Sequence, residues 1–545
     1  MRDILSRLRE LDVRARVGEL EGPFADETIG QFIDSGVRFV GSHDALENVY
    51  YHAVHDLARC VAPAENGKPM LIEGADFIGC WLESTGTINS ELLSRFCPGV
   101  AQSSFELFAD YIRDDGLIPY KHTDKGPGYR QVQMVTPLAR SVWRLYRQNG
   151  DKQFLRKMYD AIARNDQWLA EHRDTRGTGC VEAFCTFDTG HDASPRFWHV
   201  PDVPAGDPAK YDEASPILPF LAPDMTANVY CQRKYLHKMA QELNLPSDWD
   251  KKAQQTHDSL MKQCYDEQDR FFYDRDKLDR FVRIQTDNLM RVYACEAGDD
   301  EMFEDALSRY FLNTRKFFPR YPLTTIAIDD PRFLQAFEYN AWSGQLSFLT
   351  ESRLPAMFDH HRRHVELTWI LHPILTALSR FERFAGSLNI WVGAEGYKEN
   401  YTPTMVCLLD YLERMSGIFP TPDRTLWFTA LVPTGVDYGQ IVAEQTGYSR
   451  RVDGALFELV NDKDVSQIYL DQQLLYTLPR GVRLVTDRSG KLLSLIGMVP
   501  HAVTGTITYQ GQQLPFTVSG NEQLDLVDGK LVSSFNPGVV PPNYG

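Results

Sequence analysis

The most informative segment of the sequence is Phe187-Asp188-Thr189-Gly190-His191-Asp192-Ala193-Ser194-Pro195-Arg196-Phe197. It sets two carboxylates, an arginine and aromatic rings in one Gly- and Pro-containing loop between segments of helical pattern. Cleavage of a sugar needs a carboxylic acid that protonates the glycosidic oxygen and a second carboxylate that acts on the opposite face of the ring. Asp192 is the candidate acid. The alternative is an Asx-type turn in which Asp188 and Asp192 bond only backbone amides.

On both sides of this loop, residues from about 43 to about 418 have the pattern of successive amphipathic helices, often in pairs. Pro223-Asp224 is a helix start signal, and Pro246-Ser247-Asp248 separates that helix from the next and caps the second one. Further pairs are predicted over 138–146 with 154–169, and over 289–294 with 302–311. About a dozen helices are expected, which gives a mainly α body.

The pattern changes at Thr425. Short β-branched or aromatic segments follow, such as 426–432, 455–460 and 482–485, separated by turns like Asp487-Arg488-Ser489-Gly490. Closely spaced segments of this kind predict an antiparallel β-sandwich. We therefore expect a helical catalytic domain with an N-terminal extension over residues 1–424 and a β-sandwich domain over 425–545, with the Pro/Gly-rich tail from Asn536 as a surface strap or a loose end.

Composition narrows the class of protein. The chain has 545 residues, 43% of them hydrophobic, and a net charge of -17 with a pI near 5.3, which disfavours nucleic acid as a partner. No apolar stretch approaches the length of a membrane span, and Met1-Arg2-Asp3-Ile4-Leu5 does not begin a signal peptide, so a cytoplasmic protein is expected. Nine cysteines without a Cys-x-x-Cys pair argue against a disulfide framework and a zinc site, and predict reduced, mostly buried thiols.

A helical body of about six hairpins followed by a sandwich resembles the six-hairpin, or (α/α)6-barrel, glycosidases. Residues 188–197 resemble the acidic-x-Gly-x-Asp-x-Ser-Pro-Arg-aromatic loop of the glycoside hydrolase family 63 group, which includes mannosylglycerate hydrolases and, more distantly, family 37 trehalases. Other matches follow in the expected order: Asp115-Gly116-Leu117-Ile118-Pro119, Pro223-Asp224-Met225-Thr226-Ala227-Asn228, Trp342-Ser343-Gly344-Gln345 and Glu399-Asn400-Tyr401-Thr402-Pro403.

The resemblance implies an inverting glycoside hydrolase without a cofactor or metal, exo-acting on a small α-linked glucoside or mannoside, such as a disaccharide, a short oligosaccharide or a glycosyl-glycerate. Asp192 would be the general acid and Glu399 the general base, with carboxyl groups roughly 6.5–9.5 Å apart. The chain departs from the family pattern: Gln345 replaces a proline, Asp188 replaces a glutamate, and Thr402-Pro403 lacks the usual Thr-Gly after it. Glu395 and Glu338 therefore remain alternatives for the base.

Several residues are expected to shape a sugar-binding pocket, because ring faces stack on the C–H face of a pyranose and carboxylates or amides bind its hydroxyls. We expect Arg196 either to contact substrate or to pair with Asp188. The other candidate binding residues are Asp188, Trp81, Trp198, Trp342, Trp391, Tyr401, Gln345, Asp76 and Glu83.

Other functions remain open. His360-His361-Arg362-Arg363-His364 is interpreted as solvated surface, with a metal site or a basic edge for a substrate carboxylate as the alternatives. The same barrel also houses sugar epimerases and polysaccharide lyases, for which His199, His361 and Tyr401 would be the reacting residues. A non-catalytic carbohydrate-binding protein is a third possibility. The sequence leaves a homo-oligomer open.

Overall fold

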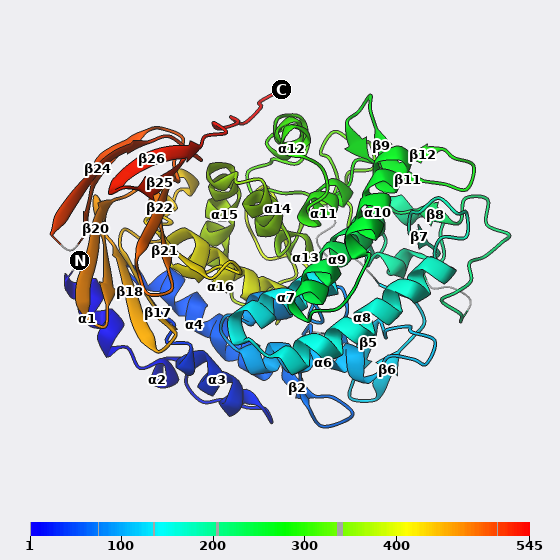
Figure 1. The fold of residues 1–545 in the computed structure, drawn as a ribbon, viewed down its shortest axis with the longest axis horizontal. Helices are drawn as coiled ribbons and strands as arrows, with labels where there is room; N and C mark the ends of the chain where they lie inside the picture. The colour runs from blue at the N-terminus through cyan, green and yellow to red at the C-terminus, as the bar shows by residue number, and fades with distance from the viewer. Residues whose placement is uncertain (1, 75, 134–136, 203–205, 335–341, 510) are drawn as a thin grey trace.

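The computed structural model describes residues 2–545 except 75, 134–136, 203–205, 335–341 and 510. Helices predominate over strands in the first three quarters of the chain, and two antiparallel sheets lie beside them (Figure 1). The helices are α1 (Arg2–Glu10), α2 (Val13–Val17), α3 (Ala25–Asp34), α4 (Asp44–Arg59), α5 (Ile88–Leu93), α6 (Pro98–Asp110), α7 (Leu138–Asn149), α8 (Lys152–His172), α9 (Pro223–Glu242), α10 (Trp249–Cys264), α11 (Asn288–Ala294), α12 (Asp300–Ala306), α13 (Phe348–Glu351), α14 (Leu354–His360), α15 (His364–Leu378) and α16 (Thr402–Ser416).

The predicted helical pairs are confirmed, and local chemistry explains their ends. Helix α7 ends at Gly150, whose left-handed φ of +70° suits a residue without a Cβ atom. Asp151 then caps α8 by accepting from the amides of Gln153 and Phe154. Pro223 occupies the first turn of α9. Asp248 lies at the predicted start of α10, but its side chain makes no capping hydrogen bond.

Contacts between helices run in a closed series. Helix α5 contacts α7, α7 contacts α9, α9 contacts α11, and α11 contacts α14. Helix α14 contacts α13, α13 contacts α16, and α16 returns to α5. Helices α4, α6, α8, α10 and α15 contact members of this series, and α12 leads into the turn Leu307–Phe311. The helices of this series, called the inner helices below, therefore follow one another in a closed ring of contacts.

The two large sheets are antiparallel. The six-stranded sheet has the order β15 (Ile418–Pro420), β16 (Thr425–Thr429), β21 (Val482–Asp487), β22 (Leu492–Gly497), β25 (Gln523–Val527), β26 (Lys530–Phe535). The seven-stranded sheet has the order β1 (Arg38–Gly41), β17 (Thr446–Val452), β18 (Ala455–Asn461), β19 (Val465–Leu470), β20 (Gln473–Pro479), β23 (Val503–Tyr509), β24 (Gln512–Val518). Side chains of the two sheets meet, as the rings of Phe428 and Phe457 do at 5.6 Å.

Two segments extend these sheets beyond the predicted boundary. Strand β1, from the N-terminal region, pairs with β17. Strand β15 precedes residue 425 and pairs with β16. At the other end of the chain, the amide of Asn543 donates to the carbonyl of Leu312 at 2.8 Å, so of the two alternatives for the tail the structure has the strap against the helical body.

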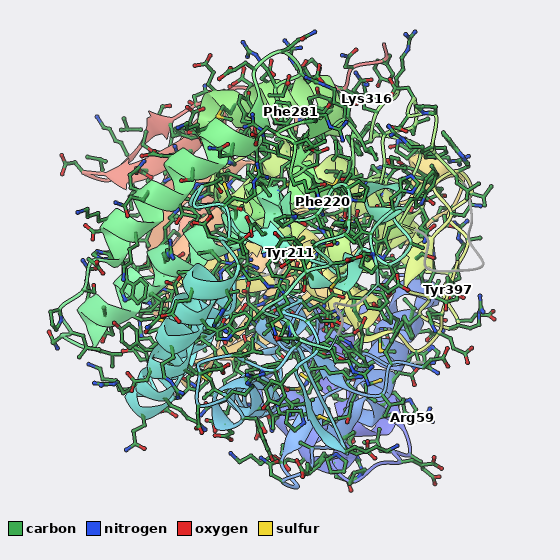
Figure 2. The ribbon with its side chains drawn as sticks, turned by 90° about the vertical axis from the view of Figure 1, so that its right-hand side faces the viewer. Arg59, Tyr211, Phe220, Phe281, Lys316 and Tyr397 are labelled. Atoms are coloured by element: carbon green, nitrogen blue, oxygen red, sulfur yellow. The ribbon has the colours of Figure 1, made fainter. Side chains whose placement is uncertain are left out.

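Short strands connect the helices, among them β4 (Cys80–Trp81), β7 (Glu182–Ala183) and β8 (Phe220–Leu221). Figure 1 shows β7 and β8 at the side of the helical body away from the two large sheets, and Figure 2 looks onto that side, where loops cover the helix ends and Tyr397 lies near one edge. All nine cysteines are buried, as predicted, and their thiols are free. Across the described part of the chain, no helix has both the length and the apolar character needed to span a bilayer.

Candidate active site

The loop over residues 187–197 is held by Asp188. This buried carboxylate pairs with both terminal nitrogens of Arg173 at 2.5 and 3.2 Å, and accepts from the amides of Phe184 and Val132 at 2.8 and 3.1 Å. With four donors around it, Asp188 has no capacity left for a substrate hydroxyl, so its prediction as a substrate-binding residue was wrong. Asp188 therefore positions the loop that carries Asp192.

Arg196 does not pair with Asp188, so that prediction was wrong. Its guanidinium makes two bidentate pairs instead, with Asp224 at 2.8 and 2.7 Å and with Asp274 at 2.5 and 2.6 Å. The reason is geometric, because Arg173 at the end of α8 already occupies Asp188. Arg196 ties the loop to the start of α9.

His191 is buried behind Asp192 and connects the loop to Trp342. Its Nε2 lies 3.0 Å from Oδ1 of Asp287, and its ring centroid is 4.8 Å from that of Trp342. Burial, together with the positive charge of Arg291, lowers the pKa of His191 to about 4. The imidazole is therefore neutral at neutral pH.

A second segment of the site forms where Glu73-Gly74 meets Asn400-Tyr401. Gly74 pairs with Tyr401 in an antiparallel bridge, and the amide of Thr402 donates to the carbonyl of Glu73 at 2.9 Å. Gly74 has a φ of +94°, and a Cβ atom there would lie 1.9 Å from the carbonyl oxygen of Asn400. Only glycine allows this approach. Chain segments more than three hundred residues apart are thereby joined.

The side chains at this junction form a buried polar group. The Tyr401 hydroxyl donates a short hydrogen bond to Oε1 of Glu73, and Ser84 donates to Oε2 at 2.9 Å. Burial raises the pKa of Glu73 to about 7, and the charge of Asp192 adds to that rise. Asp192 itself is half-buried. The predicted acid thus lies within electrostatic range of Glu73 and Tyr401.

Glu83 joins this group from the other side of the loop. Its carboxylate lies against Gly190, where a Cβ atom would come within 1.5 Å of Oε2. Burial raises the pKa of Glu83 to about 7, the charge of Glu73 raises it further, and Arg353 and Arg291 oppose the rise. Three carboxyl groups (Asp192, Glu73 and Glu83) and two guanidinium groups therefore interact at this end of the inner helices.

Polar side chains are concentrated in the first turns of the inner helices or just before them. Asn89 in α5 and Asn228 in α9 are buried, and their amide atoms have no hydrogen-bond partner within the described residues. The same holds for Nε and Nη1 of Arg353, which precedes α14. Such groups are available to a polar ligand.

Aromatic side chains border the same region. Trp342 and Tyr401 pack with Leu349 and with Phe77, whose ring lies 5.8 Å from Trp81. Trp342 and Gln345 are both buried. Together with Tyr397 and Lys398 these residues line a cavity of about 20 Å³, the size of one water site.

The structure does not bring every predicted site residue into this group. Glu399 and His199 are exposed to solvent. Trp198 and Trp391 are exposed as well, with 56% and 39% of their surface accessible. Asp76 is also exposed and pairs with Lys398 at 2.5 Å. The carboxylate of Glu395 accepts from the amides of Glu382, Arg383 and Ala385. Glu338 lies outside the described residues.

The interpretation of the histidine-rich segment as solvated surface was wrong. His361 and His364 are buried, and His361 stacks on Phe303 at 4.2 Å while its Nδ1 lies 2.8 Å from Asp300. The cause is that the segment joins α14 to α15 and contacts the C-terminal sheets. Among the described residues, no group of three or more His, Cys, Asp or Glu has the arrangement of a metal site.

Sequence reasoning missed four residues of the site. His191 lies inside the quoted loop, next to Asp192, and that position could have suggested it. Glu73 directly precedes Gly74 in the sequence, which could have suggested it in the same way. Arg291 and Arg353 carried no local signal, because only the packing of α11 and α14 brings them to Thr189 and Glu83.

Comparison with known proteins identifies a glycoside hydrolase domain. Residues 89–347 match the model of the mannosylglycerate hydrolase MGH1-like glycoside hydrolase domain. No curated protein gives a significant match. Among solved structures, the family 63 mannosylglycerate hydrolase from Thermus thermophilus in complex with Tris is 14% identical, with a TM-score of 0.56 over 67% of this chain and 99% of that one.

Two further structures share the fold. A sialidase is 14% identical with a TM-score of 0.63, over 84% of this chain and 42% of that one. The family 78 rhamnosidase of Bacillus sp. GL1 is 11% identical with a TM-score of 0.53, over 78% of this chain and 40% of that one. The chain is thus an O-glycosyl hydrolase. The particular group it resembles is the mannosylglycerate hydrolase-like glycosidases, as the sequence motifs predicted.

Proposed function

We propose that the protein is an inverting, exo-acting glycoside hydrolase for a small α-linked glucoside or mannoside, glycosyl-glycerates included. The closed ring of inner helices would be an (α/α)6 barrel within residues 1–424, and the two sheets a β-sandwich centred on 425–545. The closed series of helix contacts supports the first assignment, and the antiparallel order of both sheets supports the second.

Asp192 is proposed as the general acid that protonates the glycosidic oxygen. The observation that carries this role is its position next to the buried Glu73–Tyr401 pair, on a loop that Asp188 and Arg196 hold by ion pairs. The Glu73–Tyr401 hydrogen bond and the ion pairs of the loop fix the surroundings of the Asp192 carboxyl group, and a fixed position is what a proton donor to a glycosidic oxygen requires.

Glu399 remains the proposed base that activates water. It lies two residues before Tyr401, in the segment that adjoins Gly74, and it is exposed to solvent. Approach of a water molecule to an exposed carboxylate is unobstructed, and a bound sugar would complete the surroundings of that carboxylate.

Substrate hydroxyls would be bound by carboxylates and amides around Asp192. Glu83 and Gln345 are the buried candidates, and Trp342 with Tyr401 supplies ring faces for the pyranose. Trp81 and the exposed side chains Trp198, Trp391 and Asp76 would contact substrate only at the rim. No cofactor is required. Nine cysteines outside disulfides support a reducing, cytoplasmic location.

The test is incubation of the protein with α- and β-linked disaccharides and glycosyl-glycerates, followed by anomer-resolved proton NMR, repeated on Asp192→Asn and Glu399→Gln. An inverted first product and loss of turnover in both variants are expected. Wild-type turnover in either variant would remove that residue from the mechanism. Conservation of substrate mass or an unsaturated product would instead assign an epimerase or a lyase. Sugar binding without turnover would assign a carbohydrate-binding protein.

A further inference from the structure

A second cavity lies between the helical body and the six-stranded sheet. This junction cavity has a volume of about 620 Å³ and is lined by side chains of α5, α7, α9, α14 and α16 and of strands β15, β16, β21, β22 and β25. Pockets of roughly 300–1,000 Å³ are typical of small-molecule sites. A cavity of this volume can hold a monosaccharide.

The junction cavity is distant from the candidate active site. Asp224, in the first turn of α9, binds Arg196 of the catalytic loop, whereas Lys238 of the same helix lines the junction cavity. Fourteen residues of α-helix separate these positions by roughly 20 Å. The two sites therefore lie toward opposite ends of α9.

Cations outnumber carboxylates on the walls of the junction cavity, although the whole chain carries a net charge of -17. Four lining residues are Asp or Glu: Glu91, Glu296, Asp359 and Asp423. Six lining residues are Lys or Arg: Arg95, Arg144, Lys234, Lys238, Arg362 and Arg414. A concave surface with excess positive charge concentrates anions.

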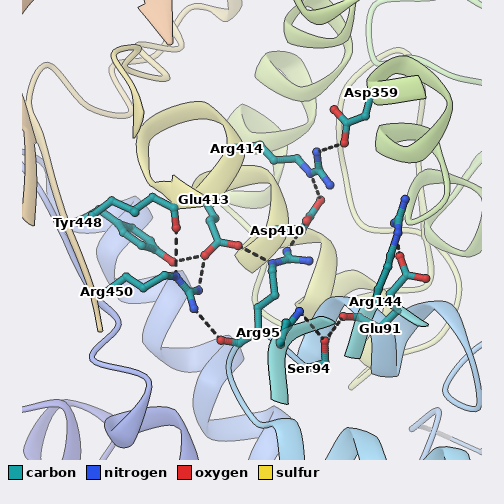
Figure 3. A network of polar contacts seen from close by, with 12 residues as sticks. Glu91, Ser94, Arg95, Arg144, Asp359, Asp410, Glu413, Arg414, Tyr448 and Arg450 are labelled. Carbon is teal, nitrogen blue, oxygen red and sulfur yellow. Dashed lines mark hydrogen bonds and ion pairs between the residues drawn. The ribbon is translucent and has the colours of Figure 1, made fainter. Parts of the chain in front are cut away.

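The ion pairs behind the wall do not remove this excess. Figure 3 shows Arg95, Arg414 and Arg450 matched by Asp359, Asp410 and Glu413 in one network, and Arg144 paired with Glu91. Glu91 also faces Arg140 at 3.7 Å, so one carboxylate serves two guanidinium groups there.

Two cations of this region, the lining residue Lys238 and Arg483 beside the lining residue Trp427, have no carboxylate within 4.0 Å in the described part of the chain. Arg483 is buried against Trp427, with 4.3 Å from its guanidinium carbon to the ring centroid, and donates to Thr429 at 2.9 Å. Lys238 is exposed and lies 4.4 Å from the ring centroid of Tyr235.

His364 adds a directed donor. Its Nδ1 accepts from Arg483 at 3.2 Å, since a guanidinium can only donate. Burial and the charges of Arg483, Arg414 and Arg362 hold the pKa of His364 well below its usual range. The neutral ring then carries its proton on Nε2, which makes that atom a donor.

Aromatic rings complete the lining. Trp143 and Trp427 are half-buried and both line the junction cavity, with Phe419 5.4 Å from Trp427. Indole rings stack on the C–H face of a sugar ring, while Lys and Arg bind phosphate or carboxylate. We propose that the junction cavity is a second ligand site, which binds a monosaccharide carrying a phosphate or carboxylate group.

The test is isothermal titration of the full chain at low ionic strength with glucose 6-phosphate, glucuronate, glucose and inorganic phosphate. At least one of the two anionic sugars is expected to bind at least tenfold more tightly than glucose or inorganic phosphate, and binding should weaken with added salt. The two anionic sugars separately test phosphate and carboxylate as the recognised group. Failure of both to bind, or equal affinity for glucose or inorganic phosphate, would overturn the proposal.

Two variants locate the ligand. Lys238→Ala and Trp143→Ala should each weaken binding at least fivefold, while their circular dichroism and their hydrolytic activity stay unchanged. Lys251→Ala, at an exposed position of the neighbouring α10, is the matched control and should bind as the wild type does. Wild-type affinity in both cavity variants would place the ligand elsewhere and refute the site. Because the readout is binding, the result is independent of the proposed hydrolase mechanism.

Discussion

Glu73 makes the stability of this protein depend on pH in a predictable direction. Burial raises its pKa from 4.5 to about 7 in the folded protein, whereas the unfolded chain keeps the lower value. Between these two pH values the folded state holds a proton that the unfolded state has lost, so unfolding becomes easier as pH rises. Each pKa unit corresponds to roughly 1.4 kcal/mol, so the cost above pH 7 is about 3 kcal/mol.

Glu73→Gln removes this ionisation and, like the protonated carboxyl group, offers one acceptor and one donor to the hydroxyl groups of Tyr401 and Ser84, which can themselves donate or accept. Relative to the wild type, the variant should gain about 2.5 kcal/mol in the free energy of unfolding between about pH 5 and about pH 8. Urea-induced unfolding followed by tryptophan fluorescence, with reversibility checked, measures the difference. Glu301→Gln, at an exposed position, is the control. A variant-minus-wild-type difference that is equal at both pH values would refute the reasoning.

Three other substitutions test the scaffold of the site. Arg196→Lys loses the two bidentate pairs, so it should lower the free energy of unfolding by about 3–5 kcal/mol, measured by urea unfolding, and remove most of the activity. Activity close to that of the wild type would argue against the role of Arg196 in holding the loop. Gly74→Ala forces a Cβ atom against Asn400 and should abolish activity or folding, whereas Gly30→Ala, which meets no atom within 4 Å, should be tolerated; equal effects would contradict the close approach. Tyr401→Phe removes the hydrogen bond to Glu73 without removing the ring. In steady-state assays it should therefore lower kcat about tenfold or more and change KM little. An unchanged kcat would exclude that hydrogen bond from the reaction.

Much of the fold could be predicted from the sequence because its signals are local. Helical periodicity and the Pro223 start signal predicted α9, and the change of pattern at Thr425 predicted the sheets. Strands β1 and β15 were missed for a physical reason. Each is only three or four residues long, so each is defined by pairing with a distant partner rather than by its own pattern.

Part of the site was predictable because some of its sequence signals are also local. Asp192 and Tyr401 belong to recognisable sequence motifs. The predicted pair of Arg196 with Asp188 was wrong because it rested on proximity in the sequence. In the fold, Asp188 pairs with Arg173, and Arg196 pairs with Asp224 and Asp274. Long-range ion pairs of this kind are set by tertiary packing, and no local pattern encodes them.

The most direct test of the central claim is the first anomer released from a cleaved glycoside, observed by proton NMR within the first turnovers, for the wild type and for Asp192→Asn. The account predicts that the wild type releases the anomer opposite in configuration to the substrate and that Asp192→Asn releases almost none. A retained anomer would contradict the inverting mechanism, and wild-type release by Asp192→Asn would contradict the assignment of the acid.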